Sequence, residues 1–570
     1  MIETLDIATE QINDLPLLLG IVEDMGIRRL IDARIRPHGG WRGISVGTVV
    51  SIWLCHLLME RDHRLVSVRD WAAARASTVN ALLGITLRET DLTDDRLANA
   101  LTMLGDAADQ AAVDRALLAD WIAVYALPTA TVRLDSTSVS VYHDDRPAGG
   151  LLRPGHSKDH RPDLAQFKAM LAMLAMLASL DPLGLPVALQ VVPGNAADDG
   201  LYVPAYDAAV AALGTADVLV VGDSKMGARA TRAHIAAKGS AYLCAYRPAG
   251  ATAEIAGWVE AAVARPARWQ ELRAVDERTG EIATLAVIDA WARDQQDGET
   301  AWVERVLVVR SAQMQAGLRR TRERALARVA DQLALLQRPP GRGRAVYRTR
   351  AALDAVVAGL LAAARLEGIV QVELAADTRP DGSARWAVGA IAVDRAAWQR
   401  MVDRLGWHVY VTNTTADQYA APALVDAYRH QVIQERGFAR LKTRNLRIRP
   451  VYLADERRIA GLTWLLCLAL RVLTLTEYRL RTALQRRGEA LAGLNPASRA
   501  QTTSRPTTER VVAAFQNITR TAIALPGTTL THVTPLTPVQ AHILALLDLP
   551  ADLYDRLAAP APQPLAHLRE

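Results

Sequence analysis

The amino-acid sequence predicts an α/β protein: a mixed sheet flanked by helices, interrupted by a β-rich insertion and preceded by a helical domain. Three observations support this prediction. Residues 1–126 place apolar residues at steps of three and four, as amphipathic helices do. From residue 131 the pattern becomes three strands, helix, strand, helix, strand, which is typical of a mixed sheet between helices. Several further strands between 250 and 405 then interrupt this order before it resumes.

Length and composition set the broad class. The chain has 570 residues, half of them apolar and 22% charged, which is the balance of a globular protein of about three or four domains. No uninterrupted apolar run reaches the ~20 residues that a membrane span needs. The N-terminal stretch MIETLDIATEQ lacks the pattern of a secretion signal. Cys55, Cys244 and Cys467 stand singly in apolar surroundings, so they predict neither a zinc site nor disulfides. We therefore expect a cytoplasmic protein without a membrane segment.

The N-terminal helices are expected in three stretches. They are LPLLLGIVEDMGIRRLIDARI (15–35), VGTVVSIWLCHLLMERD (46–62) and DDRLANALTMLGDAADQAAVDRALLADWIAVYAL (94–127). Asp94 or Asp95 is a suitable cap for the last of these helices. Pro128 then ends it.

The central sheet is predicted from the segment that follows. TVRLDSTSVSVYH (131–143) alternates and is rich in β-branched residues, as strands are. FKAMLAMLAML (167–177) has helical propensity, but its neighbours favour a strand buried on both faces. A turn at DPLG (181–184) and a strand at LPVALQVVPGN are expected next. Then follow a helix at 199–213, strand 216–223, helix 226–239 and strand 241–248.

The insertion and the C-terminal part complete the prediction. Strands are expected at WQELRAVD, ATLAVIDAWA, AWVERVLVVRS and ARWAVGAIAVD, with two helices between them and a joint at PPGRGR (339–344). HVYVTNT returns to strand. One helix from about Ala423 should contain YRHQVIQERGFARLK, followed by a long helix from 459 to 487 and a linker at 495–509. The expected domains are 1–126, 127–249, 250–405, 406–494 and 495–570.

One polar stripe is expected on the helix after Ala423. Tyr428, Glu435 and Lys442 recur at intervals of seven, which on an α-helix falls only ~20° short of two full turns. Gln431 lies beside them. Taken alone, this spacing favours an ordinary solvated stripe.

Basic residues are unevenly distributed, although the net charge is only +5. RGFARLKTRNLRIR (436–449) holds six cations and no anion, and LRRTRERALAR (318–328) is a second basic segment. A solvated face would normally mix both signs, so the first segment favours a phosphate-facing surface. Only five basic residues are lysine: Lys158, Lys168, Lys225, Lys238 and Lys442.

Three acids are candidates for chemistry. Asp135 should lie inside the first strand of the sheet, Asp223 at the end of the fourth, and Glu435 on the later helix. Carboxylate oxygens are the ligands that Mg²⁺ or Mn²⁺ prefers, and two such ions ~4 Å apart can support phosphodiester displacement. The separation of these acids in sequence is weak support by itself.

The chain resembles bacterial insertion-sequence transposases of the DDE class, in the insertion-sequence-four-like superfamily. The resemblance lies in RLDSTSVSVYHDD around Asp135, GLPVALQVVPGNAADD, VLVVGDSKMG around Asp223, and YRHQVIQERGFARLK. The last stretch matches the signature Y-x2-R-x3-E-x6-K, except that Gln431 replaces the arginine. The resemblance implies a ribonuclease H-like fold in which Asp135, Asp223 and Glu435 are the catalytic and metal-binding residues.

The resemblance also implies partners. Mg²⁺ or Mn²⁺, as two ions, is the expected cofactor, and the expected partner is double-stranded DNA, namely terminal inverted repeats and target DNA. We expect a homodimer associated with the nucleoid. The expected DNA-binding residues are Tyr428, Lys442, Gln431, Arg429, Arg436, Lys225 and Lys158. A tryptophan of the insertion is expected to stack on a flipped base, without the sequence selecting which one.

Alternatives remain at this stage. A transposase-derived DNA-binding protein without catalysis would fit the missing signature arginine. A stand-alone nuclease of the same fold would cut without joining. His156 and His160 are four residues apart, a zinc-like step on a helix, but Gly155 and Pro162 disfavour a helix there, so we interpret them as structural.

Overall fold

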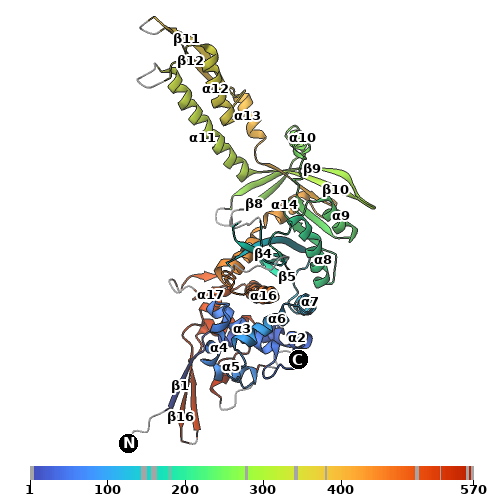
Figure 1. Cartoon of the computed structure of the whole chain (residues 1–570), viewed down its shortest axis with the longest axis vertical. Helices are drawn as coiled ribbons and strands as arrows, with labels where there is room; N and C mark the ends of the chain where they lie inside the picture. The colour runs from blue at the N-terminus through green and yellow to red at the C-terminus, as the bar shows by residue number, and fades with distance from the viewer. Residues whose placement is uncertain are drawn as a thin grey trace. The chain divides into compact units, whose positions relative to one another are not determined.

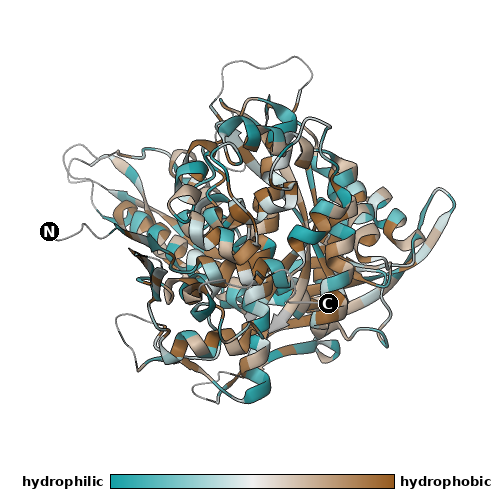
Figure 2. Ribbon diagram, turned by 90° about the horizontal axis from the view of Figure 1, so that it is seen from below, coloured by the Kyte–Doolittle hydropathy of each residue, from teal (hydrophilic) through white to brown (hydrophobic). Residues whose placement is uncertain are grey.

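The computed structural model describes residues 6–142, 150–155, 163–178, 181–275, 280–338, 345–378, 382–494, 498, 500–526, 528–559 and 564–565 (Figure 1). The chain forms two compact units. Unit 1 comprises Met1–Tyr242 together with Arg429–Glu570, and unit 2 comprises Leu243–Tyr428. Figure 2 shows hydrophobic and hydrophilic residues interspersed along many of the helices, as amphipathic helices have them.

The predicted N-terminal helices are present in unit 1. The first stretch forms α1 (Leu15–Asp24) and α2 (Ile27–Arg34), the second α3 (Val46–Glu60), and the third α6 (Asp94–Leu104) and α7 (Ala107–Tyr125). Two further helices, α4 (Leu65–Ala73) and α5 (Ala76–Leu83), lie outside the predicted stretches. The first and third predicted stretches are thus two helices each rather than one. Thr93 occupies the N-cap position of α6, so Asp94 and Asp95 lie in its first turn, where they complement the helix dipole instead of capping it. Asp106 caps α7 by accepting hydrogen bonds from the backbone of Ala108 and Asp109.

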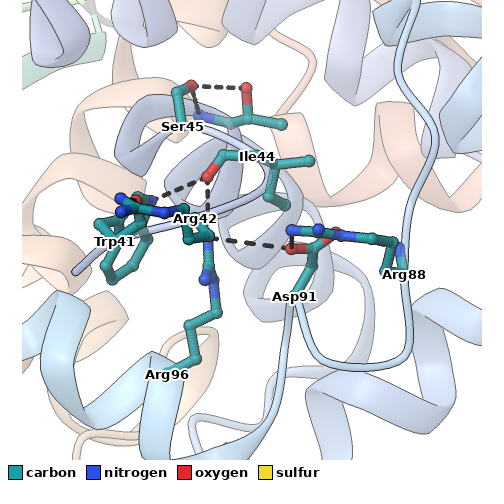
Figure 3. Close-up of polar contacts among 8 residues, drawn as sticks. Trp41, Arg42, Ile44, Ser45, Arg88, Asp91 and Arg96 are labelled. Carbon is teal, nitrogen blue, oxygen red and sulfur yellow. Dashed lines mark hydrogen bonds and ion pairs between the residues drawn. The ribbon is translucent and has the colours of Figure 1, made fainter.

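The loop before α3 is held by polar contacts to α6 (Figure 3). The carbonyl oxygen of Ile44 accepts hydrogen bonds from Trp41 Nε1 and from the Arg96 guanidinium, both at 2.9 Å. The Arg96 guanidinium also lies 3.9 Å from the centre of the Trp41 ring, within cation–π range. These contacts fix the start of α3 against a helix about fifty residues later in the chain.

A strand at the beginning of the chain escaped prediction. β1 (Asp6–Gln11) pairs antiparallel with β16 (Thr519–Leu525), which pairs with β17 (Thr528–Val533). Figure 1 shows β1 and β16 as neighbouring strands of an extended ribbon. The hydroxyl of Tyr554 donates to the carbonyl of Asn13 at 2.9 Å. The C-terminal residues therefore belong to unit 1 together with the N-terminal helices. Within it, α17 (Thr508–Ala513) and α18 (Pro538–Leu546) contact the long helix near the C-terminal end of the chain, Glu456–Arg487.

The mixed sheet of unit 1 has the predicted strands. β2 (Thr131–Val141) pairs antiparallel with β4 (Ala165–Ala178) and parallel with β6 (Leu219–Gly222). β5 (Asp181–Pro193) and the short β3 (Arg153–Pro154) both pair with β4. AMLAMLAML is thus a strand despite its helical propensity, because two long neighbours supply its backbone hydrogen bonds. The turn expected at 181–184 is wrong, since β5 already begins at Asp181.

Helices pack against this sheet. α8 (Tyr202–Leu213), which follows a 3₁₀ turn at Asp198–Leu201, contacts β4 and β5, and α9 (Arg229–Ala237) follows β6. The long helix α16 (Glu456–Arg487) contacts β5 and α6 and is buried along most of its length. By length and composition α16 could cross a membrane, but 94% of its most apolar window is buried inside the protein. Its buried Arg471 pairs with Asp114 of α7, which marks α16 as a core helix.

The single helix predicted from Ala423 through Lys442 is wrong. α14 (Ala421–Arg429) ends before a turn at 430–431, α15 (Val432–Ala439) follows, and Arg440–Arg444 form a π-helical turn. The backbone at the break turns tightly, since Ile433 N donates to His430 O and Gln434 N to Gln431 O. The seven-residue stripe is therefore interrupted between Tyr428 and Glu435. The boundary between the two units falls at the same place, after Tyr428.

Unit 2 contains an antiparallel sheet and a smaller α/β module. The sheet order is β7 (Ala241–Ala245), β13 (Trp407–Thr412), β10 (Thr300–Ser311), β9 (Ile282–Asp297) and β8 (Gln270–Val275). The strand register of β7 with β13 begins at Leu243. α10 (Thr252–Val263) precedes β8. The strands expected at 269–276, 283–292 and 301–311 are thereby confirmed.

The smaller module, residues 312–403, has a core of its own. It consists of α11 (Ala312–Gln337), α12 (Arg350–Ala364), β11 (Val370–Thr378), β12 (Ala384–Val393) and α13 (Arg395–Asp403). α11 and α12 lie side by side next to the β11–β12 hairpin (Figure 1). Leu333, Leu353 and Leu366 are fully buried in its core. The module is inserted between two paired strands, because Ser311 N donates to Gly406 O at 3.0 Å. The predicted joint 339–344 lies outside the described residues.

Candidate active site

Two aspartates lie at corresponding positions of neighbouring parallel strands in unit 1. In the register of β2 with β6, Leu134 is opposite Gly222. Asp135 directly follows Leu134 in β2, and Asp223 directly follows Gly222 at the end of β6. Because adjacent strands run ~4.8 Å apart, this register brings the two carboxylates to one place on the sheet.

Glu435 reaches the same place because α15 packs closely on the sheet. A Cβ at Gly184 of β5 would lie 2.4 Å from a methyl group of Ile433, and a Cβ at Gly437 would lie 2.8 Å from the side chain of Met173 in β4. Each side of this contact therefore depends on a residue without a side chain. The close approach presents the exposed side of α15, with Glu435, beside Asp135 within β2 and the end of β6.

The three acids line one small cavity of about 70 Å³ in unit 1. Its walls come from β2, from β6 and the residue after it, and from the chain around the start of α15: Arg133, Asp135, Val221, Gly222, Asp223, Gln431, Gln434 and Glu435. Thus the fold brings together side chains separated by up to three hundred residues. Gln431, which replaces the signature arginine, is among them.

Asp223 is oriented by two hydrogen bonds. Its Oδ1 accepts from the hydroxyl of Tyr202 at 2.6 Å and from the backbone N–H of Lys225 at 2.8 Å. Burial, reinforced by the charges of Asp223 and Asp135, raises the pKa of Tyr202 well above its ordinary value. The phenol therefore stays protonated and acts as a hydrogen-bond donor to Asp223.

Two cavity residues were missed by sequence reasoning. Arg133 is 1% exposed and lies two residues before Asp135, hence on the same face of β2. Strand alternation could have identified it. Gln434 is 7% exposed, and its Nε2 has no hydrogen-bond partner within the described residues. Its position directly before Glu435 on the predicted helix was the signal that could have identified Gln434 as a cavity residue. Both side chains add polar groups to a cavity that otherwise carries only carboxylates and Gln431.

The other predicted DNA-binding residues are dispersed. Tyr428 belongs to unit 2, where its ring centre lies 4.2 Å from that of Tyr410. Arg429 is exposed, Arg436 is half-buried, and Lys442 is half-buried in the π-helical turn. Lys225 is exposed, with Nζ 3.7 Å from Asp199. Lys158, His156 and His160 lie outside the described residues.

One residue of the basic run 436–449 is buried in ion pairs and is not part of a basic surface. Arg440 is 5% exposed and forms ion pairs with Glu477 and Glu509. Because a buried guanidinium needs paired carboxylates, its role is to join the π-helical turn to α16 and α17. The expectation of a phosphate-facing surface is therefore wrong for Arg440.

The donor set suits a hard divalent cation in its chemistry. Asp135, Asp223 and Glu435 offer only oxygen atoms, the ligands of Mg²⁺ and Mn²⁺. Across the described ranges, no three His, Cys, Asp or Glu side chains are gathered closely enough to hold a metal ion by themselves. The carboxylates thus converge on one cavity without closing a cage.

Comparisons with known proteins yield two matches. Residues 129–472, more than half of the chain, match a family described as the transposase DDE domain. Residues 7–113 match a domain family of unknown function (DUF4277). No curated protein matches the chain. The first match contains all three acids of the cavity, and the second covers most of the N-terminal helices.

Proposed function

Because the chain belongs to the family of transposase DDE domains, we propose that it cuts the ends of an insertion sequence and joins them to target DNA by divalent-metal-dependent phosphodiester transfer. The observation that carries this proposal is the convergence of Asp135, Asp223 and Glu435 on one cavity. Water would attack the scissile phosphodiester first, and the freed 3′-hydroxyl would then attack a phosphodiester of the target.

The three carboxylates would hold Mg²⁺ or Mn²⁺, in the form of two ions. Bound there, the ions would activate the attacking oxygen and stabilise the leaving one. Tyr202 keeps the Asp223 carboxylate in one orientation through its 2.6 Å hydrogen bond. Arg133 places a buried positive charge among the acids, which lowers the cost of gathering them. The amide of Gln434 is positioned to donate a hydrogen bond to a phosphate oxygen or a water in the cavity.

DNA would be held through its phosphate backbone by the basic residues predicted from the sequence. Arg429, Arg436, Lys225 and Lys442 are our proposed contacts to the phosphate backbone, together with Lys158 and the hydroxyl of Tyr428. Gln431 would contribute a neutral hydrogen bond where the family signature has a cation. The partners would be terminal inverted repeats and target DNA, and a homodimer in the cytoplasm, associated with the nucleoid, would pair two ends.

Removal of single acids tests the proposal. We expect Asp135→Ala, Asp223→Ala and Glu435→Ala each to abolish Mg²⁺-dependent nicking of a supercoiled plasmid that carries the element ends, because the remaining carboxylates bind the ions too weakly. Chelation of divalent ions by EDTA should do the same to the unmodified protein. Binding of the same DNA should persist in all three variants.

The matched control is Glu323→Ala, which removes an exposed carboxylate of α11 in unit 2 and should leave nicking unchanged. Normal nicking by Asp223→Ala would contradict the assignment. An unmodified protein that binds the ends and never cuts them in Mg²⁺ or Mn²⁺ would favour a transposase-derived DNA-binding protein without catalysis. Cutting without joining would favour a stand-alone nuclease.

A further inference from the structure

Unit 1 has a second, larger cavity of about 460 Å³ that shares no residue with the acidic one. One wall is the loop Glu60–Arg64, which connects α3 to α4. The other wall is formed by Arg447, Arg449, Pro450 and Tyr452, in the segment after the π-helical turn. The cavity, called the arginine cleft below, thus lies between the domain matched by the family of unknown function and the chain that follows Glu435.

The charge of the arginine cleft is predominantly positive. Four arginines face two acids, and both acids are already engaged. Burial alone would raise the pKa of Asp62, but hydrogen bonds from Arg64 and Ser67 outweigh burial and lower it to about 2. Glu60 accepts a hydrogen bond from Trp71 Nε1 at 2.9 Å. In contrast, the side chains of Arg61 and Arg447 form no hydrogen bond or ion pair with any residue that the structure describes.

The backbone at these two arginines is unusual. Arg61 has a φ of 56° and Arg447 a φ of 46°. This left-handed region is uncommon for residues with a side chain and favours glycine. Arg61 is the C-cap residue of α3, a position at which glycine is the usual choice. Arginine at both positions is unfavourable for local folding, so its presence on both walls indicates that the guanidinium groups serve another purpose.

The two walls are fixed to each other. His63 is 5% exposed, and its ring centre lies 5.8 Å from that of Tyr452. Burial lowers the pKa of His63, and hydrogen bonding to the backbone at Pro450 and Ile448 opposes that shift. The histidine is therefore neutral at physiological pH and ties one wall to the other. The arginine cleft is a preformed site rather than a chance gap between loops.

We propose that the arginine cleft binds the phosphate backbone of the DNA duplex whose strand is cut at the acidic cavity. This inference rests on the proposed function. Guanidinium groups on two fixed walls suit a polyanion with repeated phosphates, since each can form paired hydrogen bonds to phosphate oxygens. Because the second wall directly follows α15 and its π-helical turn, bound DNA would join the N-terminal helices to the helix that carries Glu435.

Salt-dependent DNA binding tests the inference with two substitutions and two controls. Arg61→Gly and Arg447→Gly remove one guanidinium each and relax the backbone. The controls Arg36→Gln and Arg115→Gln each remove an exposed arginine of unit 1 that lies outside the cleft and outside the basic run 436–449. The probe is a fluorescein-labelled mixed-sequence DNA duplex, titrated at several salt concentrations by fluorescence anisotropy.

We expect each glycine variant to bind the duplex about fivefold more weakly at physiological salt, with the slope of log Kd against log salt reduced by about one. Their Tm should be unchanged or higher, since glycine relieves the left-handed backbone. A purely structural role of the arginines would not produce this combination. The controls should change the slope by less than half as much.

Two negative outcomes are distinguishable. If the unmodified protein binds the duplex with a steep salt dependence and cuts element ends, but the glycine variants bind like the controls, the arginine cleft is not a phosphate site and the proposed function stands. If the unmodified protein neither binds nor cuts DNA, the proposed function fails and this inference fails with it.

Discussion

Tyr202 shows how a single hydroxyl group can determine the geometry of the acidic cavity. Its hydrogen bond to Asp223 is 2.6 Å long, and the tyrosine is 2% exposed. We expect Tyr202→Phe to lower the rate of Mg²⁺-dependent nicking roughly 10- to 100-fold, the range for residues that orient metal ligands. The Mg²⁺ concentration for half-maximal rate should rise, whereas DNA affinity should not change.

Tyr206→Phe is the matched control for this substitution. Tyr206 is equally buried on the same helix, and its hydroxyl contacts Ser240 at 2.6 Å, away from the cavity. The Tyr206→Phe variant should therefore show the same Mg²⁺ dependence of nicking as the unmodified protein. If both variants shifted the Mg²⁺ dependence alike, the effect would come from α8 packing rather than from orientation of Asp223.

Asp14 gives the protein a pH-dependent stability. Burial raises the pKa of this side chain to about 7 in the folded protein, against 3.8 for an ordinary aspartate. Between these values the folded state holds a proton that the unfolded state has lost, so stability decreases as pH rises from about 4 to 7 and is level above. Asp14→Asn removes this dependence. We expect it to stabilise the protein by about 2–4 kcal/mol at pH 8 and by little at pH 4.

Urea denaturation at both pH values measures the difference. Asp6→Asn is a suitable control, because Asp6 is exposed in β1 and its neutralisation should matter little at either pH. Equal stabilisation by Asp14→Asn at pH 4 and pH 8 would show that Asp14 is not protonated in the folded protein at neutral pH.

At the scale of elements, local pattern identified the strands that carry the aspartates. Alternation along TVRLDSTSVSV was sufficient to predict the strand with Asp135, and the short apolar run before Asp223 was sufficient to predict the strand that precedes it. Both strands have a distinct local pattern, and the strands beside them lie within the same part of the sequence. The close contacts that place Glu435 could not be predicted from the sequence. The contacts of Gly184 with Ile433 and of Gly437 with Met173 join elements about 250 residues apart, and nothing local distinguishes these glycines from others.

The break between α14 and α15 at residues 430–431 could not be predicted from the sequence for a related reason. YRHQVIQERGFARLK contains no proline, and its one glycine, Gly437, lies inside α15, so propensity favours one continuous helix. Tertiary packing decides instead, since α15 must lie close on β4 and β5 while α14 ends at the border of the other unit. β1 was missed because a six-residue strand near the chain start gains stability only from a partner at the far end of the sequence.

The module 312–403 is an insertion between two strands that already form a pair. Arg310 is opposite Trp407, and Ser311 donates to Gly406. We expect that replacing residues 312–405 by an Asn-Gly turn yields a folded protein, because that dipeptide closes a two-residue hairpin between antiparallel strands. Its Tm should lie within a few degrees of that of the unmodified protein.

Circular dichroism and limited proteolysis measure this outcome. The comparison variant carries a Pro-Pro dipeptide at the same junction, which cannot form the hairpin and should unfold at a lower temperature. Aggregation of the Asn-Gly variant, or loss of a cooperative transition, would show that the module core stabilises the rest of unit 2.

At the scale of the molecule, unit 1 is assembled from the two ends of the chain. α16 supports this assembly through buried ion pairs, with Arg471 bound to Asp114 of α7 and Arg479 bound to Asp24 of α1 at 2.8 Å. Such pairs contribute little net stability but penalise any arrangement that separates the partners. The acidic cavity inherits this dependence, because two of its acids come from the first segment of unit 1 and the third from the second segment.

The pairing of Asp6 with Ala524 has a consequence for synthesis of the protein. A ribosome adding roughly 5–20 residues per second needs on the order of half a minute to two minutes between these positions. During that interval β1 has left the ribosome exit tunnel without its partner strand, and Glu435 is translated roughly two hundred residues after Asp223. Nascent chains that terminate early would therefore expose an unpaired strand to chaperones and proteases, and they would lack a complete acidic cavity.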